Sequence, residues 1–210
     1  MFGNIINPLF KGLELSVFTF LFSVILDFSV SSRTLMNTIK KDPELYVKGI
    51  QANLINLFIL SPIYYLFLDL LFLDNSSNKM DLQKLASVTL THNILYYLGH
   101  MAMHKIKYLN SIHDFHHEFK TTIPSSGNAV SISEYNFAYV LPFVMGIIMF
   151  KPNSITLSGS VYLISFFNTL IHCDELSDIK WPIFMVSPQD HGIHHKYKTR
   201  KYSAPILKLD

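Results

Sequence analysis

Residues 134–173, EYNFAYVLPFVMGIIMFKPNSITLSGSVYLISFFNTLIHC, decide the fold of this chain. Two apolar stretches, 134–150 and 152–173, meet here at the tight break Lys151–Asn153, and the second contains no Lys, Arg, Asp or Glu. A membrane-spanning helix needs about 20 mostly apolar residues. The segment therefore predicts a hairpin of two spanning helices, although the shorter first stretch also fits a buried core helix.

Two further apolar stretches lie earlier, at 12–30 and 51–73. Half of the 210 residues are hydrophobic and 15% are charged, whereas soluble domains carry about 25% charged residues. We therefore predict an all-α integral membrane protein with about four transmembrane helices. Residues 12–73 would form its membrane anchor. The N-terminal sequence lacks a basic start and a small-residue cleavage site, so we expect a retained anchor and not a signal peptide.

Composition also excludes several classes of function. The net charge is only +2, and no basic run is interleaved with aromatic residues, which argues against a nucleic-acid partner. Cys173 is the only cysteine, so neither an internal disulfide nor a CxxC zinc site is possible. We find no repeat and no Gly/Ser linker, and we predict one domain over residues 1–210.

Eight of the ten histidines fall into three short motifs. HMAMH at 100–104 is HxxxH, and HDFHH at 113–117 and HGIHH at 191–195 are both HxxHH. For this composition, chance would place two HxxHH motifs in roughly a few of 10,000 chains. On a helix, residues i, i+3 and i+4 share one face, so we expect each motif to present its imidazoles together.

Crowded imidazoles repel one another when protonated, and metal binding keeps them neutral. The motifs contain few carboxylates, which argues against magnesium and calcium, but imidazole suits iron, zinc and copper alike. A metalloprotease is not supported, because HEFKT has Thr121 where HExxH needs its second histidine. A serine hydrolase is not supported either, because GxSxG is absent.

The hairpin also predicts the topology. Residues 74–133 and 174–210 would emerge on one side of the membrane, and residues 31–50 on the other. Most Lys and Arg residues would then lie on the side of the histidines. The positive-inside rule places that side in the cytosol.

The ordered motifs HxxxH, HxxHH and HxxHH resemble the fatty acid hydroxylase and sterol desaturase superfamily over roughly residues 90–210. YYLGHMAMHK is similar to its aromatic helix, and IHDFHHEFKTTIP is especially similar to C4-methylsterol oxidases and cholesterol 25-hydroxylases. IHCDELSDIKWP resembles the family's single histidine, which adds His172, and HHKYKTRKYSAPILKLD resembles its final segment.

The resemblance implies a non-haem di-iron oxidoreductase of the monooxygenase type. It would use O2 to hydroxylate, oxidatively demethylate or desaturate a membrane lipid, most simply a sterol, in lipid biosynthesis at the endoplasmic reticulum. Electrons would come from an external NAD(P)H reductase or cytochrome b5. The implied ligands of the two irons are His100, His104, His113, His116, His117, His172, His191, His194 and His195.

The chain departs from the family pattern at several positions. SISE at 131–134 keeps Glu134 but has Ser131 where many members have histidine, and Asn168 argues against the fatty acid 2-hydroxylase branch. Ser131 and the end of the chain at Asp210 motivate an alternative, a catalytically degenerate metal-binding scaffold of the same fold.

Four further residues are weighed for a role around the metals. Asp114, Glu118 and Asp190 flank the motifs and are candidates to orient the metal-bound histidines. For His92, outside the motifs, we favour a satisfied polar residue over such a role.

Overall fold

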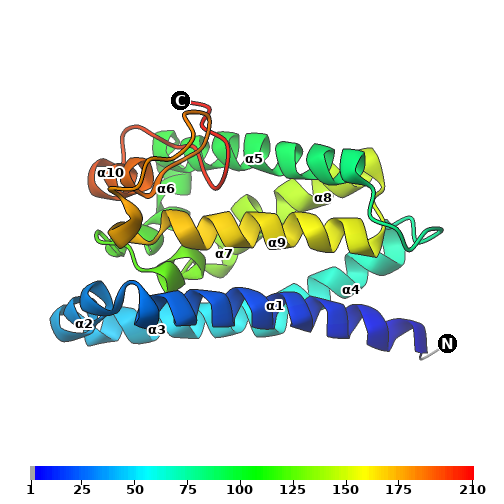
Figure 1. Ribbon diagram of the computed structural model, residues 1–210, viewed down its shortest axis with the longest axis horizontal. Helices are drawn as coiled ribbons and strands as arrows, with labels where there is room; N and C mark the ends of the chain where they lie inside the picture. The colour runs from blue at the N-terminus through cyan, green and yellow to red at the C-terminus, as the bar shows by residue number, and fades with distance from the viewer. Residues whose placement is uncertain (1–2) are drawn as a thin grey trace.

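The computed structural model describes residues 3–210, with side chains from Ile6 onward, and shows a bundle of long helices (Figure 1). The bundle consists of α1 (Gly3–Ser29), α3 (Pro43–Asn53) continued by η1 (Leu54–Leu60) and α4 (Ser61–Leu71), α5 (Leu82–Lys105), α7 (Ile132–Glu134) continued by η4 (Tyr135–Val140) and α8 (Leu141–Phe150), and α9 (Ser154–Ile171). The shorter elements are α2 (Ser32–Lys41), α6 (Lys107–His113), η2 (His116–Glu118), η3 (Pro124–Asn128), η5 (Asp174–Leu176) and α10 (Pro188–Tyr197). The described residues contain no strand, only one bridge between Met185 and Leu207. The all-α prediction is confirmed.

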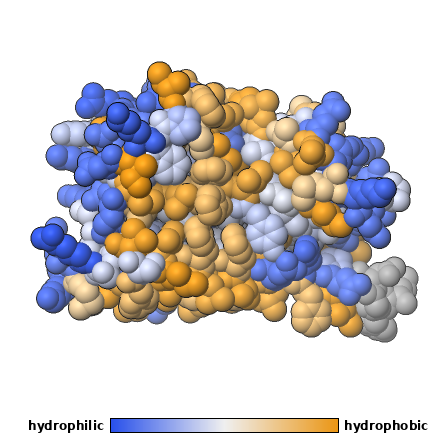
Figure 2. Space-filling view, viewed as in Figure 1, coloured by the Kyte–Doolittle hydropathy of each residue, from blue (hydrophilic) through white to orange (hydrophobic). Residues whose placement is uncertain are grey.

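Four helical segments are long and apolar enough to cross a membrane: Ile6–Ser29, Pro43–Leu71, Ile132–Phe150 and Ser154–Ile171. They correspond to the four predicted stretches. A broad hydrophobic band covers the middle of the molecule, and hydrophilic residues gather toward its two ends (Figure 2). Phe10, Ile25 and Phe28 of α1 are more than half exposed. Apolar side chains exposed in such number mark a surface that lipid covers.

The second span begins earlier than the apolar stretch that predicted it. Asp42 caps α3, because its side chain accepts a hydrogen bond of 2.9 Å from the Leu45 amide, and Pro43 occupies the first turn. Both are typical helix-start signals. Glu44 and Lys48 then pair across one exposed turn at 2.9 Å. The charged first turns therefore belong to the same helix as the apolar stretch.

Each of two spans contains a π-helical segment immediately before a proline. The segment η1 precedes Pro62 by two residues, and η4 stands in the same relation to Pro142. Proline has no amide hydrogen and its ring crowds the carbonyl of residue i−4, which here is Phe58 or Ala138. A local π widening relieves that crowding without ending the helix. Both spans therefore continue through their prolines.

The predicted topology is wrong for residues 31–50 and for the start of segment 74–133, because α5 runs the length of the bundle beside α8 and α9 (Figure 1). The loop before α5 lies against the hairpin turn: the Asp74 amide donates to the Pro152 carbonyl at 3.0 Å, and Asn153 Nδ2 donates to the Ser77 and Lys79 carbonyls, each at 2.7 Å. The start of segment 74–133 thus lies at the hairpin end. From His100 onward, the residues of this segment lie at the end of the bundle opposite the hairpin turn.

Residues 31–50 consequently lie at the histidine end, not opposite it. Ser31 Oγ is 3.2 Å from Cys173 Sγ, and the Ser125 amide donates to Asp27 Oδ1 at 3.0 Å. The sequence predicted a polar connection in place of α5, because Lys84 and three histidines lower the mean hydropathy of this helix. When α5 is counted as a further pass through the bundle, residues 31–50 lie at the histidine end and the loop before α5 lies at the hairpin end.

Close helix contacts in the bundle depend on small residues. A Cβ on Gly12 of α1 would lie 2.7 Å from the Pro62 Cα of α4, so these helices approach too closely for a side chain there. On α8, a Cβ on Gly146 would lie 3.3 Å from Val88 of α5. Small residues at such crossings let helix backbones pack closely within a membrane.

Candidate metal centre

All nine predicted site histidines lie together at one end of the bundle, in two groups. The five-histidine group consists of His100, His104, His113, His117 and His194, and the four-histidine group of His116, His172, His191 and His195. Within each group, one ring nitrogen per residue lies within 4.8 Å of all the others. All are buried except His104, which is partly buried. Each group could therefore hold one metal ion.

The helix α10 shows why HGIHH serves both groups. It starts at a cap in which Ser187 Oγ accepts from the Asp190 amide, with Pro188 in the first turn. His191 and His195, four residues apart, share a face and join the four-histidine group. His194 is rotated by about 100° from His195 and joins the five-histidine group. The expectation that HxxHH places all three rings in one set is therefore wrong.

The second motif is divided in the same way but is not one regular helix. The helix α6 ends at His113, and His116 and His117 lie on the 3-10 turn η2. His113 and His117 join the five-histidine group, whereas His116 joins the other. In both HxxHH motifs the first and last histidines thus stay together, and the middle one crosses over.

The Nε2 atoms converge within each group. In the five-histidine group, Nε2 of His100 lies 2.8 Å from that of His113, and Nε2 of His104 lies 3.1 Å from those of His117 and His194. In the four-histidine group, Nε2 of His191 lies 2.9 Å from that of His172 and 3.1 Å from that of His195. His116 completes this group at 3.3 Å from His172.

Five of the nine opposite ring nitrogens are anchored, four of them by main-chain carbonyls, whereas Nδ1 of His116, His117 and His191 has no hydrogen-bond partner. Nδ1 of His100 donates to the Tyr202 carbonyl at 2.7 Å, and Nδ1 of His194 donates to the Arg200 carbonyl at 3.0 Å. In the other group, Nδ1 of His172 donates to Asn168 O at 2.6 Å, and Nδ1 of His195 to Phe119 O at 2.9 Å. A carbonyl only accepts, so these contacts fix the proton on Nδ1 and leave a lone pair on Nε2.

One anchor is a carboxylate. Glu134 Oε1 accepts from His113 Nδ1 at 2.6 Å, and both side chains are fully buried. Ser131 caps the short helix that carries this glutamate: its Oγ accepts from the Glu134 amide at 3.1 Å and donates to the Ile112 carbonyl at 2.8 Å. Ser131 thus positions the carboxylate. The SISE segment supplies this anchor although it lacks a histidine.

The predicted flanking carboxylates do not contact the histidines. Asp114 is exposed and pairs with Lys198 at 3.7 Å, and Glu118 is also exposed. Asp190 pairs with Lys201 and with Lys208, the latter at 2.8 Å. These acids are neighbours of the histidines in sequence, but their side chains project from other faces.

His92 is not brought to the centre, but the prediction that it is a satisfied polar residue is wrong, because neither of its ring nitrogens has a hydrogen-bond partner. It is buried in the middle of α5, where its ring packs 4.3 Å from that of Phe143 and 6.1 Å from that of Tyr96. It belongs to neither histidine group.

Burial lowers the pKa of every histidine in the two groups. It brings the pKa of His104 to about 3, with repulsion from His194 adding to the effect, and the pKa of His172 and of His194 to about 4. An imidazole with such a pKa is neutral at pH 7. The centre therefore presents uncharged nitrogen donors.

This donor arrangement fits bound cations. Bare lone pairs that face one another at 2.8–3.3 Å repel unless a positive charge lies among them. Two nitrogens about 2.1 Å from one ion, at a right angle, would be about 3.0 Å apart. Imidazole-only groups without thiolate also differ from the cysteine-rich structural zinc sites.

Comparison with protein families matches residues 85–210 to the model described as fatty acid hydroxylase. The match begins on α5 and contains all nine histidines of the two groups. No curated protein and no solved structure matches the chain.

Proposed function

We propose that this chain, which belongs to the fatty acid hydroxylase family, is an O2-dependent di-iron hydroxylase that acts on a sterol in the membrane. The observation that carries the proposal is the convergence of nine histidine Nε2 atoms in two adjacent groups. One group of four would suit a single structural ion. Two groups with no thiolate, in a bundle of membrane-spanning helices, suit a pair of ions used for oxidation.

The residues of the chain would hold and orient the metals. Nine neutral imidazoles, eight buried and one partly buried, would bind through Nε2, and in five of them an Nδ1 anchor prevents the ring from turning away. Such anchors raise the basicity of the ligating nitrogen and fix its tautomer. Bound iron would supply the capacity to activate dioxygen toward an unactivated C–H bond. Burial of the histidines excludes bulk water from this reaction.

The overall reaction requires an outside reductant. One oxygen atom enters the C–H bond and the other leaves as water, which consumes two electrons and two protons. The histidine end carries most of the cationic side chains, since all Lys and Arg except Lys11, Lys79, Lys84 and Lys151 lie on segments at that end. We propose that a redox partner of the cytochrome b5 or reductase type supplies these electrons at the histidine end.

The same distribution supports a location. By the positive-inside rule the histidine end would face the cytosol, and we propose the endoplasmic reticulum membrane as its location. The corrected topology still predicts that the histidine end faces the cytosol, because residues 31–50, with their four cations, lie at that end.

The decisive experiment expresses the full chain in a sterol-producing host and compares the lipids by mass spectrometry. We expect a new oxidised sterol with the unaltered chain and none with His194→Ala, which should keep its helical content by circular dichroism. The purified protein should contain about two irons per chain. Intact protein without bound metal would refute the proposal, and bound metal with an unchanged lipid profile would favour the non-catalytic scaffold.

A further inference from the structure

Residues 200–210 form a segment that follows α10 and reaches the five-histidine group. Two of its main-chain carbonyls are anchors of that group: the Tyr202 carbonyl accepts from His100 Nδ1 at 2.7 Å, and the Arg200 carbonyl accepts from His194 Nδ1 at 3.0 Å. The orientation of these two rings therefore depends on where segment 200–210 lies.

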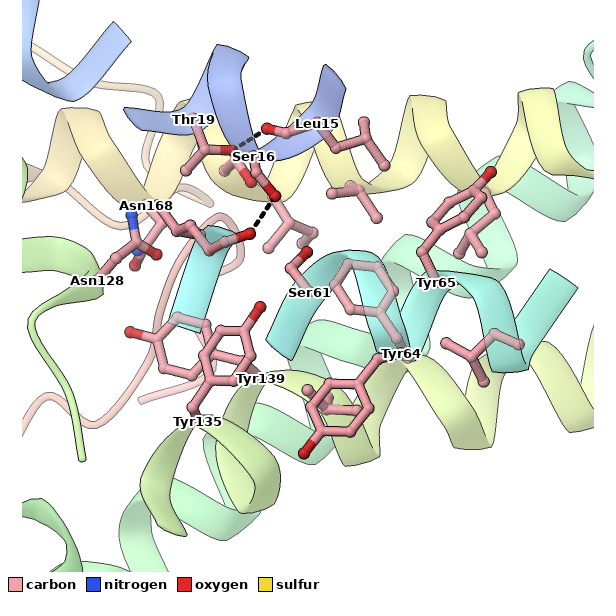
Figure 3. Close-up of a pocket in the computed structure, with 18 residues that line it drawn as sticks. Leu15, Ser16, Thr19, Ser61, Tyr64, Tyr65, Asn128, Tyr135, Tyr139 and Asn168 are labelled. Carbon is pink, nitrogen blue, oxygen red and sulfur yellow. Dashed lines mark hydrogen bonds between the residues drawn. The ribbon is translucent and has the colours of Figure 1, made fainter. Parts of the chain in front are cut away.

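The four-histidine group is anchored differently. His172 Nδ1 donates to the Asn168 carbonyl at 2.6 Å, and this carbonyl belongs to the regular helix α9. The side chain of Asn168 lies beside Asn128 at one end of a cavity among the spans (Figure 3), where its Nδ2 donates to the Gly127 carbonyl at 3.0 Å. Within the part of the chain that the structure describes, no hydrogen bond joins segment 200–210 to the four-histidine group.

A buried asparagine of α5 holds the far part of the segment. Asn93 Oδ1 accepts from the amides of Ile206 and Leu207 at 3.0 and 3.1 Å, and its Nδ2 donates to a main-chain carbonyl one turn earlier at 2.8 Å. Only 1% of Asn93 is exposed. A buried amide with both ends paired is costly to break, because water does not replace the lost partners. Asn93 therefore fastens segment 200–210 to α5.

The segment runs antiparallel to α5 between its two points of attachment. Asn93 and His100 are seven residues apart, which is nearly two full turns and about 10 Å along one face of the helix. Ala204, between the two attached parts of the segment, is buried in the same hydrophobic cluster as Tyr96 of α5. The register of the segment against α5 thus sets the position of the carbonyl that meets His100.

The peptide group that anchors His100 is itself held by a carboxylate. The carbonyl of Tyr202 and the amide of Ser203 belong to one peptide group, and that amide donates to Asp210 Oδ1 at 3.2 Å. Ser203 Oγ donates to the same oxygen at 2.6 Å, and the Tyr202 amide donates to Asp210 Oδ2 at 2.7 Å. A negative charge at the amide end polarises the peptide group and makes its carbonyl a stronger acceptor. Asp210 is exposed, so water screens part of this effect.

We propose that Asn93 and Asp210 are positioning residues of the five-histidine group. They hold segment 200–210 on α5, so that its carbonyls fix the rings of His100 and His194. The proposal deepens the proposed function, and it rests on that function only in that both histidine groups hold metal. Loosening the segment should weaken metal binding by one group and leave the other unchanged, whereas a general loss of stability would weaken both.

The test titrates the purified full chain with Co²⁺ and follows the visible absorption of the histidine-bound ion. His195→Ala leaves the five-histidine group as the intact one, and His194→Ala leaves the four-histidine group. In the His195→Ala background, we expect Asn93→Leu to weaken Co²⁺ binding about tenfold and Asp210→Asn about threefold, because both act one step behind a direct anchor. In the His194→Ala background, neither change should alter the binding.

Asn153 provides the matched control for Asn93. Its Nδ2 also makes two hydrogen bonds to the main chain of another segment, each of 2.7 Å, but at the hairpin end. Asn153→Leu should lower the melting temperature, as Asn93→Leu does, and should leave Co²⁺ binding unchanged in both backgrounds. Asp178 is an exposed acid on the segment after α9, and Asp178→Asn is the corresponding control for Asp210→Asn.

A charge-conserving variant separates the carboxylate from the general effect of a changed side chain. Asp210→Glu should recover part of the Co²⁺ affinity that Asp210→Asn loses, because it keeps the negative charge. If Asn93→Leu fails to fold, the comparison of Asp210→Asn with Asp210→Glu decides the proposal, since the exposed Asp210 can change without disturbing the core. Absence of recovery in Asp210→Glu would then overturn it.

Unchanged Co²⁺ binding by the five-histidine group in both variants, or equal weakening of both groups, would also overturn the proposal. The titration needs no turnover, so its outcome is independent of the lipid measurement. The expected pattern in a chain that forms no oxidised lipid would refute the proposed function and support this inference. Oxidised lipid without the pattern would do the opposite.

Discussion

The two histidine groups differ in ligand number, in exposure and in the charge around them. The five-histidine group includes the partly exposed His104 and is anchored through His113 by the buried carboxylate of Glu134. The four-histidine group is fully buried, and its hydrogen-bonded anchors are the neutral carbonyls of Asn168 and Phe119. Four protein ligands leave more of an ion's coordination sphere open than five do.

This difference suggests separate tasks for two otherwise similar groups. Glu134 contacts the five-histidine group through His113 Nδ1, and in its ionised form it would compensate part of the charge of an ion held there. The four-histidine group has fewer ligands, and its hydrogen-bonded anchors carry no charge. An ion held there would have more open coordination positions. The following experiments test whether the groups are distinct in this sense.

The largest effect should come from the adjacent residues His194 and His195, which belong to different groups. Either change to alanine removes one Nε2 ligand, so metal content should fall from about two ions to about one per chain. Product formation should fall at least about 100-fold in both variants. Plasma mass spectrometry of the purified proteins measures the metal.

His92→Phe is the matched control for these changes, because His92 lies outside both groups. It should keep both metals and the product. If His194→Ala and His195→Ala each retained two metals, the two sets would not be the ligands of separate ions.

An intermediate effect should come from Glu134→Gln. The amide oxygen still accepts from His113 Nδ1, but the negative charge is lost, so metal affinity of the five-histidine group should fall about 10- to 100-fold. The four-histidine group should be unaffected. Chelator titration monitored by metal content would resolve one weakened and one unchanged site. Glu118→Gln, at an exposed acid in the same part of the chain, is the control. Equal weakening of both sites would break the distinction between the groups.

The sequence predicted the four apolar spans and the eight histidines of the three motifs, because both are carried by side-chain type and spacing, whereas His172 followed only from the family resemblance. It did not predict the path of α5, since a helix that ends in His100 and His104 is less apolar than its neighbours. The division of HGIHH follows from the 100° rotation per helical residue, whereas HDFHH is divided where α6 ends and the 3-10 turn η2 begins. Only the fold shows which histidine meets which group.

The anchors of the histidines were harder to predict, for a physical reason. A main-chain carbonyl such as that of Tyr202 or Phe119 carries no sequence signature, because any residue could supply it. Glu134 lies 21 positions from His113, and only the packing of α7 beside α6 brings them together. Asp190 was a candidate because it precedes His191, yet its side chain meets two lysines on the surface.

The smallest effect should therefore come from Asp190→Asn. Hydrogen bonds from Lys201 and Lys208 hold the pKa of Asp190 below its usual value, although partial burial acts in the opposite direction. A depressed carboxyl pKa stabilises the folded state above the unfolded pKa of about 3.9, and the contribution is lost as the pH falls through the folded value. At pH 7 the variant should be less stable by about 1 kcal/mol.

Thermal melting at several pH values measures this difference between the unaltered chain and Asp190→Asn. The gap between their melting temperatures should be present at pH 7 and should close as the pH falls below about 4. Metal content at pH 7 should be the same in both proteins, because Asp190 contacts lysines and no histidine. Loss of metal from Asp190→Asn would instead show that Asp190 anchors α10. The four-histidine group would then have a carboxylate of its own, and the charge contrast between the two groups would disappear.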